Sequence, residues 1–376
     1  MSTPLPILIL DGGLGTTLET PPHNVRFTSH MPLWSSHLLI SDPSTLCDVH
    51  RAFVDVGVDI ILTATYQTSV EGFQHTDPHF TSDDAAKYMR SAIPLARDAF
   101  LNSNNSTPTK PARIALSLGP YGATMTPVAT EYTGLYPPEM DSERALRNWH
   151  KRRLQIFAAD STTWNDVEFI AFETVKRADE VRAIRAAAGT VAPVHSNSTI
   201  ATRKPWWITG VFPSEEVDEL AVREWVRAAL GQARDLDSNV HLPRPWGIGL
   251  NCTRIGNVEK IVQIMEDEVA YLASTKEEAV SGFVDEWHSI RSHRPWLVLY
   301  PDGTRNERYD PVTKEWVKKD EDKPMRAWED VFMDVIRGVE NRSNTWEGAI
   351  VGGCCRTGPW DIAALAKKVK TEKVVD

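Results

Sequence analysis

The chain of 376 residues has few cysteines, no long apolar run and no excess of basic residues. Four cysteines are too few to form a disulfide framework for a chain of this length, and they fit a reducing compartment in which thiols stay free. No stretch approaches the roughly 20 apolar residues that cross a bilayer. The net charge of −10, from 51 acidic and 41 basic residues, argues against a surface for nucleic acid or anionic lipid.

The N-terminal apolar segment is not typical of a secretion signal either. Residues 6–10 follow no basic region and run directly into Asp11-Gly12-Gly13. We therefore expect a cytoplasmic protein that does not contact membranes. Its content of 24% charged and 41% hydrophobic residues is that of an ordinary globular protein, with ample chain to bury a full core.

Short apolar runs recur along the chain, with helical patterns between them. Because these runs are continuously apolar rather than alternating, they are typical of strands that are buried on both faces. The helical patterns carry start and stop signals: Asp42-Pro43 begins one and Gly57 ends it. Strands are predicted at residues 6–11, 59–66, 113–119, 168–173, 206–211, 246–251, 296–300 and 349–353.

Eight strands alternating with helices predict an α/β fold, a (β/α)₈ TIM barrel with extended loops at its C-terminal face, in a single domain over residues 1–376. A doubly wound sheet is the alternative, but the turn from Asp11 to Thr17 lacks the G-x-G-x-x-G spacing of nucleotide-binding turns. Residues 102–110 are predicted to be a polar loop, residues 274–292 a surface helix or insertion, and residues 314–323 a solvated charged face.

Acids, amides and thiols follow the predicted strands at the points where the strands end. In a TIM barrel the active site lies at the C-terminal ends of the strands, so these side chains should converge on one mouth. The segments concerned are Asp11, Thr65 to Gln67, Gly119 to Tyr121, Glu173-Thr174, Asn251-Cys252, Pro301 to Gly303, and Gly353 to Cys355. Three of the four cysteines are among them; Cys47 lies on a predicted helix and is assigned no role.

The three cysteines at the mouth are Cys252, Cys354 and Cys355. Their spacing is not that of a local zinc knuckle, but the sixth and eighth strands are near neighbours across the seventh. Three thiolates with one open position would form a catalytic type of zinc site that accepts a further sulfur. Three buried, inert cysteines are the alternative, and the spacing alone does not decide between the two.

Seven blocks of the sequence resemble the signature blocks of the homocysteine S-methyltransferase family, in order, from Ile9 to about Ala364. The most specific element is the combination of the Asn-Cys block with the Gly-Gly-Cys-Cys block. The blocks are Asp11 to Thr16, Thr65 to Gln67, Gly119 to Ala123, Glu131 to Gly134, Phe172 to Thr174, Gly249 to Cys252, and Gly352 to Thr357.

The resemblance implies a barrel that carries one zinc ion (Zn²⁺) per chain and methylates the sulfur of homocysteine to give methionine. Zinc would deprotonate the homocysteine thiol, and no protein residue beyond the zinc site is expected to act on the methyl carbon. The implied zinc ligands are Cys252, Cys354 and Cys355. The implied homocysteine-binding residues are Asp11 and Glu173 for the amino group, the backbone at Gly12, Gly13 and Gly353 for the carboxylate, and further Thr65, Gln67 and Asn251.

The methyl donor is expected to be a cation, because a methyl group leaves readily from a positively charged centre, and aromatic faces bind such cations. Trp34, Tyr121 and Tyr132 are predicted to line the donor site, with Tyr136 nearby. The resemblance is strongest to the branch that uses S-methylmethionine or S-adenosylmethionine. Betaine-using members are the alternative, and a folate- or cobalamin-dependent methionine synthase is disfavoured because a single barrel leaves no room for its further modules.

One segment departs from the expected pattern. Tyr300 to Gly303 stands where relatives of this branch are expected to have Asn-Ser, and Thr304 to Arg308 resembles an insertion that would alter the rim. Two other classes stay open: a non-catalytic barrel that binds homocysteine or zinc, and a phosphate-binding barrel such as an aldolase. Small molecules are the only predicted partners, without nucleic acid or membrane, and the sequence leaves open whether the protein is a monomer or a homo-oligomer.

Overall fold

The structure is a computed structural model. It describes residues 5–28, 31–101, 113–125, 129–190, 204–275, 294–304, 307–310, 315–318, 326–342 and 344–372. The predicted loop at 102–110 and nearly all of the predicted surface helix or insertion at 274–292 lie outside these residues.

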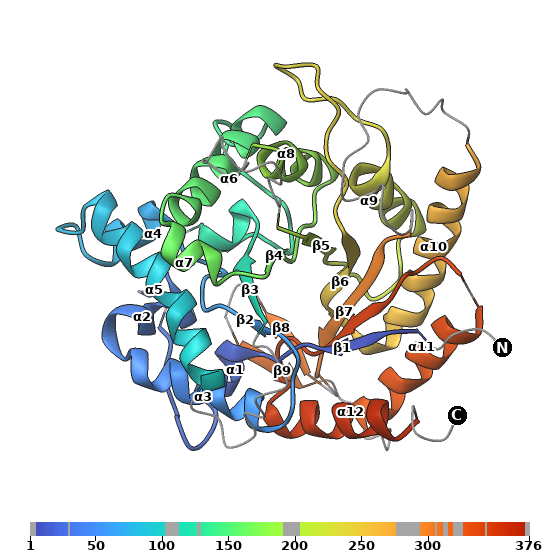
Figure 1. Ribbon diagram of the computed structural model, residues 1–376, viewed down its shortest axis with the longest axis horizontal. Helices are drawn as coiled ribbons and strands as arrows, with labels where there is room; N and C mark the ends of the chain where they lie inside the picture. The colour runs from blue at the N-terminus through green and yellow to red at the C-terminus, as the bar shows by residue number, and fades with distance from the viewer. Residues whose placement is uncertain are drawn as a thin grey trace.

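Eight parallel strands form the centre of the molecule (Figure 1). Their order is β1-β10-β7-β6-β5-β4-β3-β2, and a parallel bridge between Leu10 and Ile60 joins the two outer strands, so that the sheet curls into a barrel. The strands are β1 (Ile7–Ile9), β2 (Ile61–Leu62), β3 (Ile114–Leu118), β4 (Phe169–Phe172), β5 (Trp206–Gly210), β6 (Gly247–Arg254), β7 (Trp296–Asp302) and β10 (Ala349–Val351).

Helices surround the strands, and each long helix contacts the next one around the barrel until α12 meets α3 (Figure 1). The outer ring consists of α3 (Pro43–Asp55), α5 (Ser82–Leu101), α6 (Glu143–Ala158), α8 (Ala178–Ala188), α9 (Glu219–Leu230), α10 (Ile255–Ser274), α11 (Trp328–Arg342) and α12 (Pro359–Glu372). Shorter helices lie in the connections: α1 (Leu14–Glu19), η1 (Trp34–His37), α2 (Leu38–Ser41), α4 (Val70–Thr76), η2 (Tyr121–Thr124) and α7 (Ser161–Asn165).

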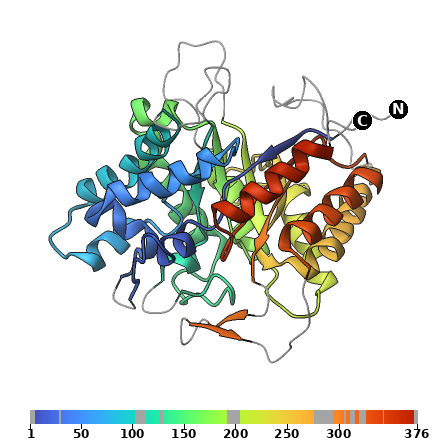
Figure 2. The same ribbon diagram turned by 90° about the horizontal axis from the view of Figure 1, so that it is seen from below.

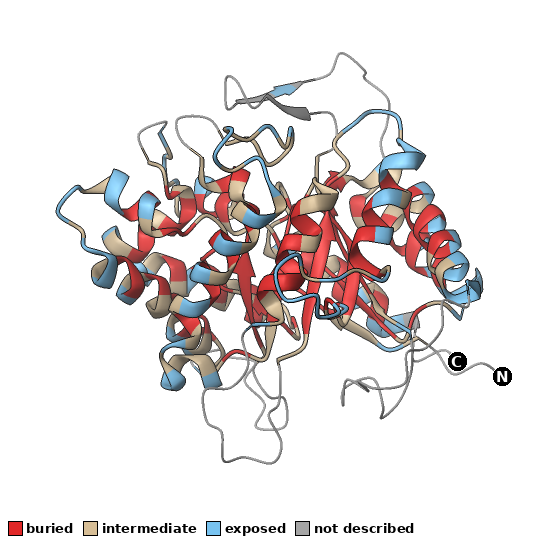
Figure 3. Ribbon diagram, turned by 90° about the horizontal axis from the view of Figure 1, so that it is seen from above, coloured by how far each residue is buried: buried red, intermediate tan, exposed pale blue. Residues whose placement is uncertain are grey.

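Burial follows the apolar pattern of the strands. Most strand residues are buried on both faces, one face against the helices and the other inside the barrel, while the outward faces of the helices are exposed (Figure 3). The interior is filled by residues of different sizes, from Ala115 and Ala171 to Trp207 and Tyr300. At Gly249 a side chain would come within 1.8 Å of the Val298 carbonyl oxygen, so only glycine allows β6 to approach β7 there.

Local capping signals begin the helices, and α3 begins at the predicted signal Asp42-Pro43. The Asp42 side chain accepts a hydrogen bond from the Thr45 N–H (3.2 Å) and caps α3, with Pro43 in its first turn. The Ser142 hydroxyl likewise caps α6 by accepting from the Ala145 N–H (3.3 Å). These caps satisfy N–H groups that have no partner inside the helix.

The eight predicted strands and the TIM-barrel fold are confirmed. The sequence did not predict a two-stranded antiparallel hairpin of β8 (Glu307–Asp310) and β9 (Glu315–Lys318), which follows β7 and stands away from the barrel (Figure 2). It uses part of the segment that was predicted to be a charged face. Among the described residues, no helix is long and apolar enough to cross a membrane.

His50 provides a test of the packing of α3. Its ring is buried, neither ring nitrogen has a hydrogen-bond partner, and burial lowers its pKa to about 4. The unfolded chain takes up this proton below about pH 6.5, whereas the folded protein does so only near pH 4, so folding stability falls as the pH drops between these values.

We expect His50→Leu to remove this pH dependence. Between pH 7.5 and pH 5 the wild type should lose about 2 kcal/mol of folding free energy through His50 alone, and the variant should be spared that loss. Urea unfolding at the two pH values measures the difference. Equal losses in the two proteins would show that His50 titrates normally.

Candidate active site

Three sulfur atoms meet at the C-terminal mouth of the barrel. The Sγ atoms of Cys252, Cys354 and Cys355 all lie within 4.8 Å of one another. Cys252 belongs to the end of β6, and the other two follow β10. Sequence positions about a hundred residues apart are therefore brought together by strands that flank β7 on both sides.

Main-chain hydrogen bonds hold this arrangement. The Cys354 N–H donates to the Pro301 carbonyl (3.0 Å) and the Gly303 N–H donates to the Cys355 carbonyl (2.8 Å), so β7 and the segment after β10 stay paired beyond the strands. On the other side, the register between β6 and β7 shifts after Asn251, where Cys252 has a left-handed φ of 46°. The irregularity turns the Cys252 side chain into the mouth.

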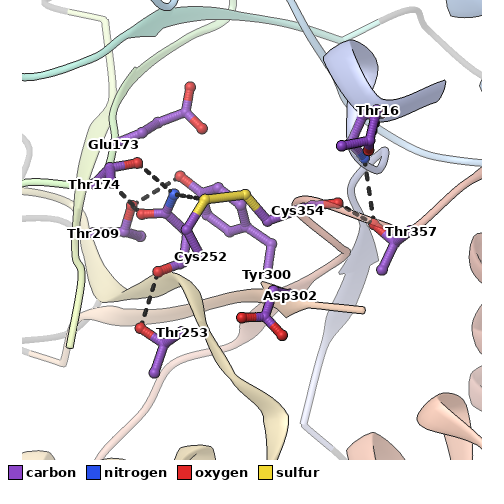
Figure 4. The surroundings of a disulfide bond; sticks show 12 residues. Thr16, Glu173, Thr174, Thr209, Cys252, Thr253, Tyr300, Asp302, Cys354 and Thr357 are labelled. Carbon is purple, nitrogen blue, oxygen red and sulfur yellow. Dashed lines mark hydrogen bonds between the residues drawn. A yellow bond between two sulfur atoms is a disulfide. The ribbon is translucent and has the colours of Figure 1, made fainter. Parts of the chain in front are cut away.

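Two of the three sulfurs form a disulfide in the structure, Cys252–Cys354, with a Cα–Cα distance of 5.5 Å (Figure 4). This differs from the expectation that all the thiols are free. The physical reason is the convergence itself, because sulfur atoms placed to share one ion are also close enough to be oxidised. Cys355 and Cys47 are free.

Two buried carboxylates lie at the ends of β1 and β4. Asp11 accepts the Leu62 N–H at Oδ2 (2.9 Å), while its Oδ1 is buried without a protein partner. Burial raises its pKa well above the usual value, and the negative charge of Glu173 raises it further. A pair of buried acids with an unused oxygen favours a cation between them, such as an ammonium group.

Glu173 is held from several sides. Its Oε1 accepts a short hydrogen bond from Ser117, and the nearby Tyr300 hydroxyl also lowers the pKa of the Glu173 carboxyl. Burial raises its pKa to about 7, while these hydroxyls and the charge of Arg153 oppose the rise. The carboxyl group therefore titrates near neutral pH.

The glycines of the predicted carboxylate site serve close packing. A side chain at Gly13 would come within 2.3 Å of the Cys354 carbonyl oxygen, and one at Gly353 within 2.2 Å of the Thr357 hydroxyl. At Gly12 the nearest atom would be the Thr357 carbonyl oxygen, at 2.5 Å. The N–H groups of Gly13 and Gly353 donate to carbonyls of Thr357 (2.9 Å) and Asp11 (3.0 Å), so these two are already used within the protein.

The segment after β2 is fixed by a buried arginine of α6. Arg153 donates to the carbonyls of Thr65 (2.8 Å), Tyr66 (2.7 Å) and Gly119 (2.8 Å). The Thr65 hydroxyl donates to the Ser117 carbonyl (2.6 Å) and is fully buried. Gln67 donates to the Ala123 carbonyl (2.9 Å), and its Oε1 is buried without a protein partner, which leaves an acceptor for a ligand.

The three predicted donor-binding residues, Trp34, Tyr121 and Tyr132, have different surroundings in the structure. Trp34 has a left-handed φ of 41° and its indole lies so close to Gly15 that a side chain there would come within 2.2 Å of the ring. Such a conformation in a bulky residue is costly and is characteristic of functional sites. The ring also packs on Phe27, at 5.7 Å between centroids.

Tyr132 lies near the cysteines, and so does Tyr66, a residue without a predicted role of its own. The charge of Cys355 contributes to the raised pKa of both phenols, whose main cause is burial. The Cys355 thiol has its own pKa raised to about 12, by burial and then by the carboxylates of Asp302 and Glu131. Tyr121 packs instead between Tyr136 (5.3 Å) and Trp149 (5.4 Å).

Asn251 and its neighbours form a hydrogen-bond network beneath the sulfurs. Thr209 and Tyr300 belong to it, although the sequence predicts no role for either residue (Figure 4). The signal for Thr209 was its place at the end of the fifth predicted strand. Nothing in the sequence alone indicates that the Tyr300 hydroxyl reaches across the barrel to Glu173.

The fold and the site define a TIM barrel with sulfur and carboxylate groups at the mouth that is reserved for catalysis in such barrels. Comparison with known proteins gives the family. The homocysteine S-methyltransferase family model matches residues 8–369, so the chain belongs to this family of methyltransferases, enzymes of the EC 2.1.1 class.

Relatives extend over nearly the whole chain. Homocysteine S-methyltransferase 4 of Zea mays is 29% identical over 374 residues, which are 98% of this chain and 91% of the relative. Selenocysteine Se-methyltransferase of Brassica oleracea var. italica is 27% identical over 379 residues, covering 97% and 89% of the two chains.

Among solved structures, the homocysteine methyltransferase MmuM of Escherichia coli shares the fold. Its metallated form has a TM-score of 0.64 at 22% identity, and its oxidised form has a TM-score of 0.65 at 22% identity. Each comparison covers 96% of this chain and 96% of the other.

Arg153 allows a test of what holds the mouth together. Arg153→Met keeps an unbranched apolar stem but leaves three carbonyls without their donor, which should lower the free energy of unfolding by about 3 kcal/mol. Urea denaturation measures the loss. Arg90→Met is the matched control, because Arg90 donates to a single carbonyl, that of Ile156 (2.8 Å), and should cost about 1 kcal/mol. Similar losses of stability in both variants would show that Arg153 does not hold the mouth of the barrel together.

Proposed function

We propose that this protein transfers a methyl group from a sulfonium donor to the sulfur of L-homocysteine, in a reaction that depends on one zinc ion per chain, and so forms methionine. The observation that carries the proposal is the convergence of the Cys252, Cys354 and Cys355 sulfurs within 4.8 Å. S-Methylmethionine is the favoured donor, and S-adenosylmethionine is a further sulfonium candidate.

The three cysteines fit a zinc ion by the chemistry of their donor set. Sulfur ligands about 2.3 Å from a tetrahedral zinc ion lie roughly 3.8 Å apart, which is compatible with sulfurs within 4.8 Å of one another once the disulfide is reduced. Three protein ligands leave a fourth position for a substrate sulfur. A zinc ion held there would lower the pKa of that sulfur and so supply a thiolate at neutral pH.

The acids of the mouth would bind the other end of homocysteine. Asp11 and Glu173 carry the negative charge that an ammonium group requires, and the unpartnered Asp11 Oδ1 offers an acceptor. Binding an ammonium would favour the charged form of both carboxyl groups, offsetting the cost of their burial. The buried Gln67 Oε1 is a further acceptor at the same mouth.

Methyl transfer then needs only the alignment of the homocysteine sulfur with the methyl carbon of the donor. The homocysteine sulfur forms a bond to the methyl carbon, and the bond from that carbon to the donor sulfur breaks with its electron pair, so that the sulfonium becomes a neutral thioether. No proton moves at the carbon. Aromatic side chains such as Trp34 and Tyr132, together with the carboxylates of Asp302 and Glu131, would stabilise the cationic donor beside the thiolate.

Methionine formation from homocysteine is the direct test, under reducing conditions with zinc present. Turnover with S-methylmethionine would support the proposal, and turnover with S-adenosylmethionine alone would change the donor. Turnover only with betaine would assign the chain to betaine-using methyltransferases. Zinc and homocysteine binding without turnover on any of the three donors would indicate a binding protein.

Cys252→Ser should lose zinc and activity together, because a hydroxyl is a far weaker zinc ligand than a thiolate. We expect less than about a tenth of the zinc content of the wild type, with the fold retained, measured by metal analysis of the reduced protein. Cys47→Ser is the control, since Cys47 lies on α3 and contacts Arg51 through its sulfur at 3.6 Å. A Cys252→Ser protein that keeps its zinc would remove Cys252 from the site.

Glu173 should make homocysteine binding dependent on pH. With a pKa of about 7, the carboxyl group is protonated as the pH falls and no longer attracts an ammonium, so the KM for homocysteine should rise roughly eightfold between pH 7.5 and pH 6. In Glu173→Gln the KM should be about tenfold higher at pH 7.5 and should depend less steeply on pH than in the wild type, with the donor KM unchanged. Wild-type homocysteine kinetics in the variant would refute the anchor role.

A further inference from the structure

The Asn251 amide uses all of its hydrogen-bonding capacity within the protein. The residue is 1% exposed. Its Oδ1 accepts from the Thr174 N–H (2.7 Å) and from the Thr209 hydroxyl (2.7 Å). Its Nδ2 donates to the Thr174 hydroxyl (2.7 Å) and to the Cys252 sulfur (3.2 Å). Two donated and two accepted bonds are what a side-chain amide can make, so Asn251 is fully engaged.

Two of its partners have a left-handed backbone. Thr174 has a φ of 60° and Cys252 a φ of 46°. For a β-branched residue such as Thr174 this conformation is strained and persists only where the surroundings enforce it. The Asn251 amide contacts both the N–H and the hydroxyl of Thr174, which is a direct means of enforcing it.

The same amide therefore lies between the two ends of the proposed substrate. On one side is Cys252, a proposed zinc ligand, and on the other is Thr174, which follows Glu173 in the chain. A second route runs from Asn251 through Thr209 to the Tyr300 hydroxyl (2.8 Å) (Figure 4). That hydroxyl also acts on the pKa of the Glu173 carboxyl.

We propose that Asn251 is a positioning residue that sets the distance between the metal-binding sulfur of Cys252 and the ammonium-binding carboxylate of Glu173. This inference rests on the proposed function and deepens it, because homocysteine spans the same two points with its sulfur and its amino group. Asn251 acts through its neighbours and needs no contact with the substrate.

Asn251 acts on the Cys252 sulfur and on the Glu173 carboxylate in different ways. At the sulfur, a donated N–H orients Cys252 and balances part of the thiolate charge, and such outer contacts typically change metal affinity 10- to 100-fold. At the carboxylate, a fixed Thr174 backbone aims Glu173 into the mouth, and loss of that order should weaken ammonium binding about tenfold.

Two binding measurements, of zinc and of L-methionine, distinguish the effect at Cys252 from the effect at Glu173 without requiring turnover. Zinc affinity is measured on the reduced protein by competition with a chelator. Binding of L-methionine, which has the ammonium and carboxylate but no thiol, is measured by calorimetry on the reduced, metal-free protein. Asn251→Ala should weaken both, zinc by 10- to 100-fold and methionine by about tenfold.

Asn251→Asp is the near-isosteric variant. It keeps the acceptor for the Thr174 N–H but replaces the donor at Cys252 with a carboxylate oxygen, so it should weaken zinc binding at least as much as Asn251→Ala while affecting methionine binding less. Thr253→Val is the matched control on the same strand, because among the residues that the structure describes its hydroxyl bonds only to main-chain groups of Asn251 (3.0 Å) and Phe212 (3.1 Å). Its affinities should stay within about twofold of the wild type.

A rescue distinguishes positioning from general loosening. Glycine adopts a φ of 60° without strain, so adding Thr174→Gly to Asn251→Ala should restore most of the methionine affinity but none of the zinc affinity. Recovery of neither affinity, or of both, would overturn the proposal. So would wild-type zinc affinity in Asn251→Asp, or an equal loss of zinc in Thr253→Val.

Failure of the proposed function gives a different pattern. If the wild type binds zinc and methionine but transfers no methyl group, methyl transfer fails and both arms still test Asn251. If the wild type binds only one of the two ligands, the mouth lacks one of the two binding points that Asn251 is proposed to space, and the proposal for Asn251 is wrong. If it binds neither, both proposals are wrong.

Discussion

The site depends on how closely three strand ends approach one another. The pairing of β7 with the segment after β10 continues past the strands, through hydrogen bonds from Gly352 to Leu299 (2.9 Å) and from Cys354 to Pro301 (3.0 Å). This pairing keeps Cys354 directly beside the end of β7, whose other neighbour, β6, carries Cys252. Glycines are required along the way, since a side chain at Gly353 would collide with Thr357. Without this contact there would be no common point for the three sulfurs.

Nearly every polar group at the mouth of the barrel favours a cation. Buried acids at Asp11 and Glu173, sulfurs at Cys252, Cys354 and Cys355, and the carboxylates near Cys355 all gain from positive charge. An ammonium group, a divalent metal and a sulfonium each supply it. Because burial is costly for isolated charges, the protein holds these groups with backbone N–H groups, hydroxyls and Arg153, and leaves the remaining balance to ligands.

The proposed function gives the sulfurs of the disulfide a second chemical state. In the structure Cys252 and Cys354 form a disulfide, and the proposed zinc site uses these atoms as ligands after reduction. MmuM of Escherichia coli, which shares the fold, has been solved in a metallated and in an oxidised form. Family membership extends over residues 8–369, a range that includes the β8–β9 hairpin after the end of β7.

The sequence by itself determined the fold class, the eight strands and the placement of the three cysteines and two acids at strand ends. It could do so because continuous apolar runs and helix caps are local signals, and because a parallel barrel gathers its strand ends on one face. Only the tertiary structure decided which polar groups contact one another. The Asn251 contacts with Thr174 and Thr209, the reach of Tyr300 to Glu173, the engagement of the Gly13 and Gly353 N–H groups and the Cys252–Cys354 bond each join segments far apart in the chain. Their distances follow from register, twist and packing, which no local pattern encodes.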